Sequence, residues 1–213
     1  MLNLILLLIF VLIAFVLWFQ GLWSNVVTLI NLLIAMMLAF NYFEPLATLL
    51  ENQNMRSYTY LWDFLILWGV FVLSYGLLRA ATDFVSRKRV VFNFWVEKIG
   101  SGVVAAWVAW LFIGFTCASL HTAPLGPHPM GFQKTPTSAE FLGFSPGRYW
   151  LAFMQSRSRG AFSRGESDGT KRSPLEKDKD VNARIFDPES TFILRYHQRR
   201  VDFEQQPSYR VAP

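Results

Sequence analysis

Residues 2–19 read LNLILLLIFVLIAFVLWF, an apolar run that only Asn3 interrupts. An α-helix rises about 1.5 Å per residue, so about 20 such residues cross the hydrocarbon core of a bilayer. A cleaved signal peptide would carry basic residues before the run and small residues after it. The first basic residue is Arg56, however, and residues 18–21 read WFQG. We therefore expect a retained membrane-spanning helix, with removal of this segment as the alternative.

Three more apolar runs follow, at residues 26–43, 61–78 and 103–120. Together with residues 2–19 they predict an all-α membrane protein with about four transmembrane helices, or three if the first run is shallow or removed. The connection between the first two runs is short, which favours an antiparallel helical hairpin.

The composition changes after residue 120. Residues 121–144 are a linker rich in proline and glycine. Ser145 and Pro146 suit the N-cap and first position of a helix, and the aromatic residues that follow predict a short amphipathic helix over 145–158. Residues 159–213 are mostly polar and charged, so we expect a largely irregular, mostly disordered hydrophilic tail. Within it, residues 192–196 read FILRY and fit either a short strand or a helical turn.

The chain carries a net charge of +5, and a basic cluster lies between the third and fourth runs. Arg87, Lys88 and Arg89 stand among Phe, Val and Trp residues, a mixture typical of the headgroup layer of a bilayer. We expect this segment to lie on the membrane surface against anionic headgroups, or to form a specific anionic-lipid site. The basic residues form no aromatic-interleaved stripe, so nucleic acid is not an expected partner.

The same cluster predicts the orientation of the chain in the membrane. Short loops rich in Lys and Arg stay in the cytoplasm. The loop between the second and third runs carries only Arg56, whereas the next loop carries several basic residues. With four spans, both termini then lie outside the cytoplasm, in the periplasm of a bacterium with two membranes.

Small and polar side chains mark helix faces that are expected to pack, because helices in lipid associate through close approach and hydrogen bonds. Such packing could join helices within the chain, copies of a homo-oligomer, or another membrane protein. Thr28 and Asn31 have a second interpretation as the lining of a polar path. The candidates for these roles are Thr28, Asn31, Gly69, Gly76, Gly102 and Ala106.

Asp63 is the one acidic residue in the predicted spans. It stands near the start of the third run, where the positive end of a helix favours a carboxylate. We expect an interfacial anchor beside Tyr58, Tyr60 and Trp62, with proton or ion coupling as the alternative.

Catalytic patterns are hard to find in this chain. His121, His128 and His197 are scattered over the linker and tail, and Cys117 is the single cysteine. None of them forms a nucleophile–base pair or the spacing of a metal site. The sequence therefore predicts neither an enzyme nor a bound cofactor.

Three short stretches resemble a known family. Residues 20–25 read QGLWSN after the first run, residues 40–47 read FNYFEPLA at the end of the second, and residues 97–100 read EKIG before a last helix rich in glycine and alanine. The order resembles the colicin V production protein family, whose turn often reads Arg-Gly-x-x-Arg-Glu and whose last helix follows Asp-Arg-x-x-Gly. The matching residues are Gly21, Glu97, Lys98 and Gly100, while the charges around Gly21 are missing.

This resemblance covers about residues 1–120 and implies a bacterial inner-membrane protein with about four helices. It further implies a role in producing or exporting a peptide toxin, or in envelope function, without a defined activity. A small oligomeric channel or transporter is one alternative. A membrane scaffold that recruits a partner through its tail is another.

Overall fold

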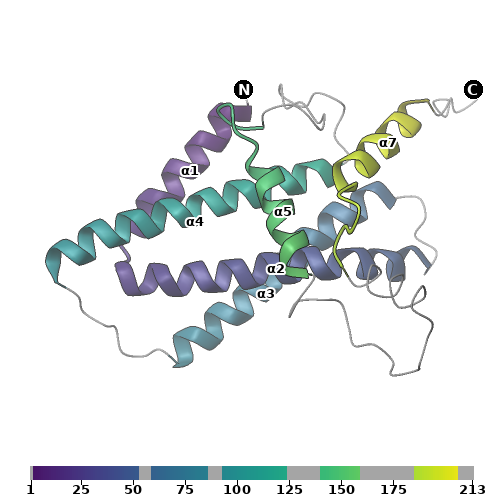
Figure 1. Cartoon of the computed structure of the whole chain (residues 1–213). Coiled ribbons are helices and arrows are strands. Elements are labelled where there is room, and N and C mark those ends of the chain that lie inside the picture. The colour runs from purple at the N-terminus through teal and green to yellow at the C-terminus, as the bar shows by residue number, and fades with distance from the viewer. Residues whose placement is uncertain (1, 53–58, 86–92, 124–139, 159–184, 206–213) are drawn as a thin grey trace, which may run out of the picture.

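The computed structural model describes residues 2–52, 59–85, 93–123, 140–158 and 185–205. These residues form helices and a single isolated bridge between Phe141 and Phe144, in agreement with the predicted all-α class. The helices are α1 (Leu2–Trp18), α2 (Leu22–Asn52), α3 (Thr59–Val85), α4 (Phe94–Thr122), α5 (Pro146–Ser158) and α7 (Phe192–Gln205) (Figure 1).

Three of these helices are long and apolar enough to cross a membrane, over Leu22–Leu49, Leu61–Val85 and Phe94–Thr122. Each one continues past an end of the predicted run, because polar residues beside the run also take helical positions. The first predicted span corresponds to α1, which is apolar throughout but has 17 residues. At about 1.5 Å per residue that is about 25 Å, a little short of a typical hydrocarbon core.

The packing of the long helices does not simply follow their order along the chain. α2 packs along α3, α1 packs along α4, and α4 also contacts α2 (Figure 1). The short turn after α1 favours an α1–α2 hairpin, and the chain does reverse there at Gly21. The main neighbour of α1 is nevertheless α4, where Ser101 Oγ donates to the Trp18 carbonyl oxygen at 3.0 Å and Leu6 packs in one buried cluster with Ile113 and Cys117.

Aromatic side chains form the centre of the core. Phe40 of α2 is fully buried, and its ring contacts aromatic rings from α2, α4, α5 and the C-terminal segment at centroid distances from 5.6 to 6.1 Å. These partners are Phe43, Phe115, Trp150, Phe186 and Phe192. Trp150, Phe186 and Phe192 therefore belong to the same core as the long helices, and each aromatic pair contributes about 0.5–1.5 kcal/mol beyond area burial.

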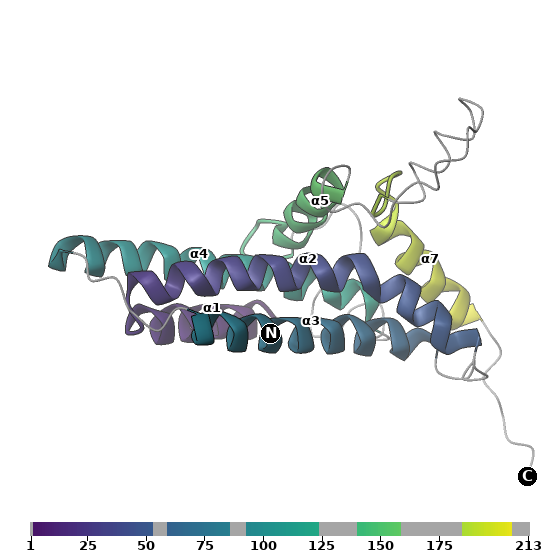
Figure 2. The ribbon, with the colours of Figure 1, turned by 90° about the horizontal axis from the view of Figure 1, so that it is seen from below.

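α5 lies where a short helix was expected, and it crosses α4 at two glycines. A Cβ on Gly114 would lie 3.1 Å from the Pro146 carbonyl oxygen, and a Cβ on Gly147 would lie 2.9 Å from the backbone nitrogen of Ala118. Glycine at both positions therefore lets the two backbones touch. Figure 2 shows α5 and α7 on the same side of the long helices, with α7 reaching the end of α2.

The C-terminal segment departs in part from the predicted irregular tail. Residues 185–205 pack against the long helices and include the 14-residue helix α7, so the helical alternative for residues 192–196 is the observed one. Burial of Phe186 and Phe192 supplies the apolar contact that an isolated polar tail would lack. The remaining parts of the predicted disordered tail, 159–184 and 206–213, lie outside the described residues.

Candidate functional site

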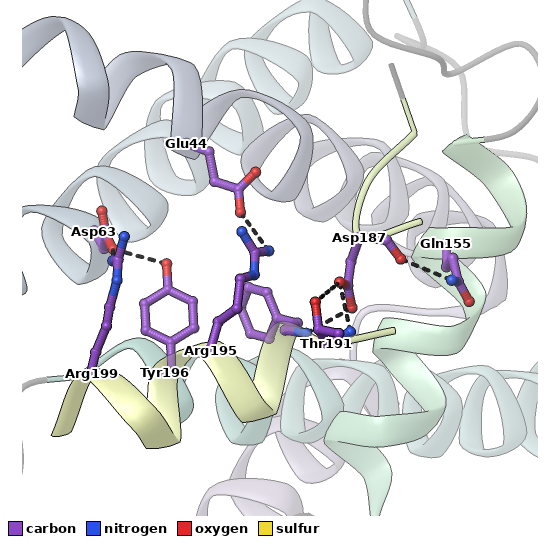
Figure 3. A network of polar contacts seen from close by, with 9 residues as sticks. Glu44, Asp63, Gln155, Asp187, Thr191, Arg195, Tyr196 and Arg199 are labelled. Carbon is purple, nitrogen blue, oxygen red and sulfur yellow. Dashed lines mark hydrogen bonds and ion pairs between the residues drawn. The ribbon is translucent and has the colours of Figure 1, made fainter. Parts of the chain in front are cut away.

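The N-terminus of α7 is held by a carboxylate. Asp187 Oδ1 accepts a hydrogen bond from the backbone N–H of Thr191 at 2.8 Å, and Oδ2 accepts one from that of Phe192 at 2.9 Å (Figure 3). A carboxylate is favoured there because the first N–H groups of a helix lack partners within it. Gln155 of α5 donates to the carbonyl oxygens of Asp187 and Pro188 at 2.8 and 3.1 Å, which ties this start to α5.

One turn further along α7, two side chains converge on a buried carboxylate of α3. Asp63 is 5% exposed, and its Oδ2 accepts hydrogen bonds from the Tyr196 hydroxyl and the Arg199 guanidinium, both at 2.8 Å (Figure 3). Burial, and then the neighbouring Asp63 carboxylate, raise the pKa of the Tyr196 phenol well above its usual range. Tyr196 therefore stays protonated and acts as a donor.

A second ion pair joins α7 to α2. Arg195 Nη2 lies 3.1 Å from Glu44 Oε1, with the two side chains 48% and 24% exposed. Such a solvent-accessible pair contributes about 0–1 kcal/mol, whereas the contacts at the buried Asp63 are costly to break. We call the set Glu44, Asp63, Arg195, Tyr196 and Arg199 the docking network, because it fastens α7 to α2 and α3.

The sequence suggested an interfacial anchor at Asp63, but it did not suggest α7 as the partner. Among the predicted neighbours, Tyr58 lies outside the described residues. The docking network joins positions more than 130 residues apart, as the Asp63–Tyr196 bond shows. The only hint in the sequence is the spacing of Arg195 and Arg199 at i and i+4, which places two basic groups on one face of a helix.

A further buried polar pair connects the end of α4 to the start of α5. His121 Nε2 lies 3.2 Å from Glu140 Oε1, and the two side chains are 1% and 2% exposed. The other carboxylate oxygen of Glu140 accepts a hydrogen bond from the Gly147 N–H at 2.6 Å. His121 was expected in the linker, but α4 continues to Thr122, so the imidazole belongs to the last turn of the helix.

The opposite end of the helical domain brings together three of the family-like residues. Glu97 Oε1 accepts the backbone N–H of Leu22 at 2.9 Å and thereby caps α2 from α4. Gly21 has a φ of +90°, and a Cβ on it would lie 2.6 Å from the same oxygen. A Cβ on Gly100 would contact the Leu22 side chain at 3.0 Å. Lys98, the fourth predicted residue, is exposed on α4.

We expect Gly21→Ala to lower the free energy of unfolding by about 1–3 kcal/mol, because a positive φ strains a residue with a Cβ and Glu97 blocks the space. Thermal unfolding of the purified protein measures the change. Gly102→Ala is the matched control, since nothing lies within 4 Å of a Cβ built there. Equal stability of the two variants would contradict this interpretation of the turn.

Two of the predicted packing residues fasten α2 to α3. Thr28 accepts a hydrogen bond from Arg79 Nη1 at 3.0 Å, and Asn31 Nδ2 donates to Thr82 Oγ1 at 2.8 Å. Both Thr28 and Asn31 are buried. Their polar groups thus join two helices, and a polar path along them stays a prediction.

The structure does not bring the remaining candidates for helix packing together in one site. In the structure nothing lies within 4 Å of a Cβ built on Gly69, Gly76 or Gly102, and Ala106 is half-buried. Packing of these residues against another chain stays a prediction. The basic residues Arg87, Lys88 and Arg89 lie outside the described residues. Within the described ranges, no group of three or more His, Cys, Asp or Glu side chains could hold a metal ion.

Comparison with known proteins adds one finding. A family model described as "Colicin V production protein" matches residues 2–145. The match covers α1 to α4 and the segment that contains Glu140, and it ends just before α5. No curated protein and no solved structure matches the chain.

Proposed function

Because the chain belongs to the colicin V production protein family, we propose that it supports the production or export of a peptide toxin, or the maintenance of the envelope. On this proposal it acts without catalysis, as a multi-pass protein of the bacterial inner membrane. The observation that carries the proposal is the family match over residues 2–145, which coincides with the apolar helices.

We further propose four membrane crossings, with both termini in the periplasm. The docking network supports one part of this topology, a C-terminal segment on the same side as the connection between α2 and α3, since it joins α7 to Glu44 of α2 and to Asp63 near the start of α3. With four crossings, that connection and the end of α4 lie on one side of the membrane, so the C-terminal segment reaches them without crossing. α1 is short, but a bilayer thins locally to match a short helix at modest cost.

Labelling with a thiol reagent that does not cross the inner membrane tests this orientation. In a Cys117→Ala background, we expect Ser167→Cys to react once the outer membrane is permeabilised, and Arg87→Cys to react only after lysis. Both outcomes follow from the basic loop being cytoplasmic. The reverse labelling pattern would overturn the orientation.

The functional proposal is tested by complementation. Cells that lack this gene and carry a plasmid-encoded peptide toxin are compared with cells that express the full chain, and secreted toxin and detergent resistance are measured. We expect both wild-type toxin secretion and wild-type resistance to depend on the protein. If neither changes in its absence, the proposed function is contradicted.

A membrane scaffold is a second candidate, because the segment 185–205 is held firmly at one end of the long helices. A truncation that removes residues 143–213 distinguishes a scaffold from a protein that acts through its membrane helices. A scaffold acting through its tail loses activity on truncation, whereas a protein that acts through its membrane helices retains it. The amount of truncated protein in the membrane is measured alongside, so that loss of the protein is distinguished from loss of its activity.

A further inference from the structure

A cleft lies between α5 and the segment that leads into α7. Its volume is about 470 Å³, within the range of about 300–1,000 Å³ that is usual for ligand sites. The residues that line it from α5 are Arg148, Tyr149, Leu151, Ala152 and Gln155, with Ser145 just before the helix. Those from the opposite wall are Asp187, Ser190, Phe192 and Ile193.

The two walls of this cleft are held at a set separation. Gln155 Nε2 donates to the Asp187 and Pro188 carbonyl oxygens and to Ser190 Oγ, at 2.8, 3.1 and 2.9 Å. Phe192 on one wall is anchored in the aromatic core around Phe40, with ring centroids 6.0 Å apart. A site with fixed walls loses little freedom when a ligand binds, which favours affinity.

The charge in the cleft comes from Arg148. The acidic side chain of the lining, Asp187, already accepts the two backbone N–H groups at the start of α7. Arg148 is exposed, and no described residue forms an ion pair with it. A guanidinium at the mouth of a partly apolar cleft favours a carboxylate, which it can bind in bidentate geometry.

The other lining residues indicate what carries that carboxylate. Leu151, Phe192 and Ile193 provide an apolar floor, while Gln155 and Ser190 add an amide and a hydroxyl. Gln155 Nε2 is already used between the walls, so the groups that a ligand can engage are Gln155 Oε1 and the Ser190 hydroxyl proton. An acyl chain offers neither of them a partner, whereas a peptide N–H can donate to Gln155 Oε1 and a peptide carbonyl can accept from Ser190. We propose that this cleft binds a short apolar peptide segment that ends in a carboxylate, with Arg148 as the carboxylate ligand. The choice of a peptide rests on the proposed role in peptide production or export.

Fluorescence anisotropy tests the proposal with the full chain in nanodiscs of phosphatidylcholine, which avoids detergent as a competing amphiphile. The probe is a labelled pentapeptide of leucine and alanine with a free C-terminal carboxylate, and its C-terminal amide is the matched ligand control. We expect the amide to bind the wild type at least about tenfold more weakly, because a charged hydrogen bond is lost. Equal binding of acid and amide, or no binding of the acid, would overturn the proposal.

Variants of α5 assign the binding to this cleft. We expect Arg148→Gln to weaken binding of the acid by about tenfold and to leave binding of the amide unchanged. Ala152→Trp, which fills the space between the walls, should abolish binding. Arg157→Gln is the matched control, since Arg157 lies on the same helix over the Phe153 ring and outside the cleft. Equal loss in Arg148→Gln and Arg157→Gln would contradict the assignment.

A lipid is the alternative ligand for this cleft, and a competition experiment distinguishes it from a peptide. Short-chain phosphatidylglycerol that displaces the probe at lower concentration than unlabelled peptide would overturn the choice of a peptide. The complementation assay tests the proposed function separately from these binding measurements. If Arg148→Gln loses peptide binding but toxin secretion never depends on the protein, the cleft assignment stands and the proposed function does not.

Discussion

A Glu140→Ala variant is expected to unfold with a free energy about 3–5 kcal/mol below that of the wild type. This carboxylate lies in a fully buried position, against His121 at 3.2 Å and the Gly147 N–H at 2.6 Å. Removal of one partner of a buried polar pair costs this much because the groups that faced it lose their compensation without regaining water. The loss should separate the start of α5 from the end of α4.

Thermal or denaturant unfolding of the purified protein measures this change. Glu189→Ala is the matched control, since Glu189 is exposed in the turn before α7 and should change stability by less than about 0.5 kcal/mol. A double-mutant cycle with His121→Ala then isolates the coupling between the two side chains. A loss below about 1 kcal/mol in Glu140→Ala would show that the pair does not hold α5.

The second large effect is expected from Asp63→Ala, which should free α7 from the long helices. Asp63 receives the hydroxyl of Tyr196, a buried group, and the guanidinium of Arg199, which is half exposed. The buried hydroxyl loses its acceptor, while the partly solvated guanidinium loses less, so we expect a cost of about 2 kcal/mol. This corresponds to roughly a 30-fold larger undocked population.

Hydrogen exchange followed by mass spectrometry reads this population directly, because the amides of α7 exchange when the helix leaves its place. Peptides that cover Phe192–Gln205 should exchange roughly 30-fold faster in Asp63→Ala. Glu44→Gln is the matched control at the neighbouring, more exposed pair with Arg195, where we expect less than about a fivefold change. Unchanged exchange in Asp63→Ala would mean that Phe192 alone anchors the helix.

The apolar runs and the short helix after Ser145 could be predicted because each depends on neighbouring residues, whereas the long helices extend past the ends of those runs. A run of 18 apolar side chains excludes water along one local segment. Ser145 and Pro146 favour a helix start through their own backbone preferences. The family pattern singled out Gly21, Glu97 and Gly100 as separate positions, and the structure showed that they meet at the start of α2.

The sequence by itself thus determined that this is a helical membrane protein, and roughly where its helices run. Only the tertiary structure decided that α1 lies along α4, that His121 meets Glu140, and that α7 docks on Asp63. The physical reason is that hydropathy and capping act between near neighbours, whereas these contacts join residues that are distant in the chain. A segment as polar as α7 becomes an ordered helix because a buried carboxylate and an aromatic core elsewhere in the chain accept its Tyr196, Arg199 and Phe192 side chains.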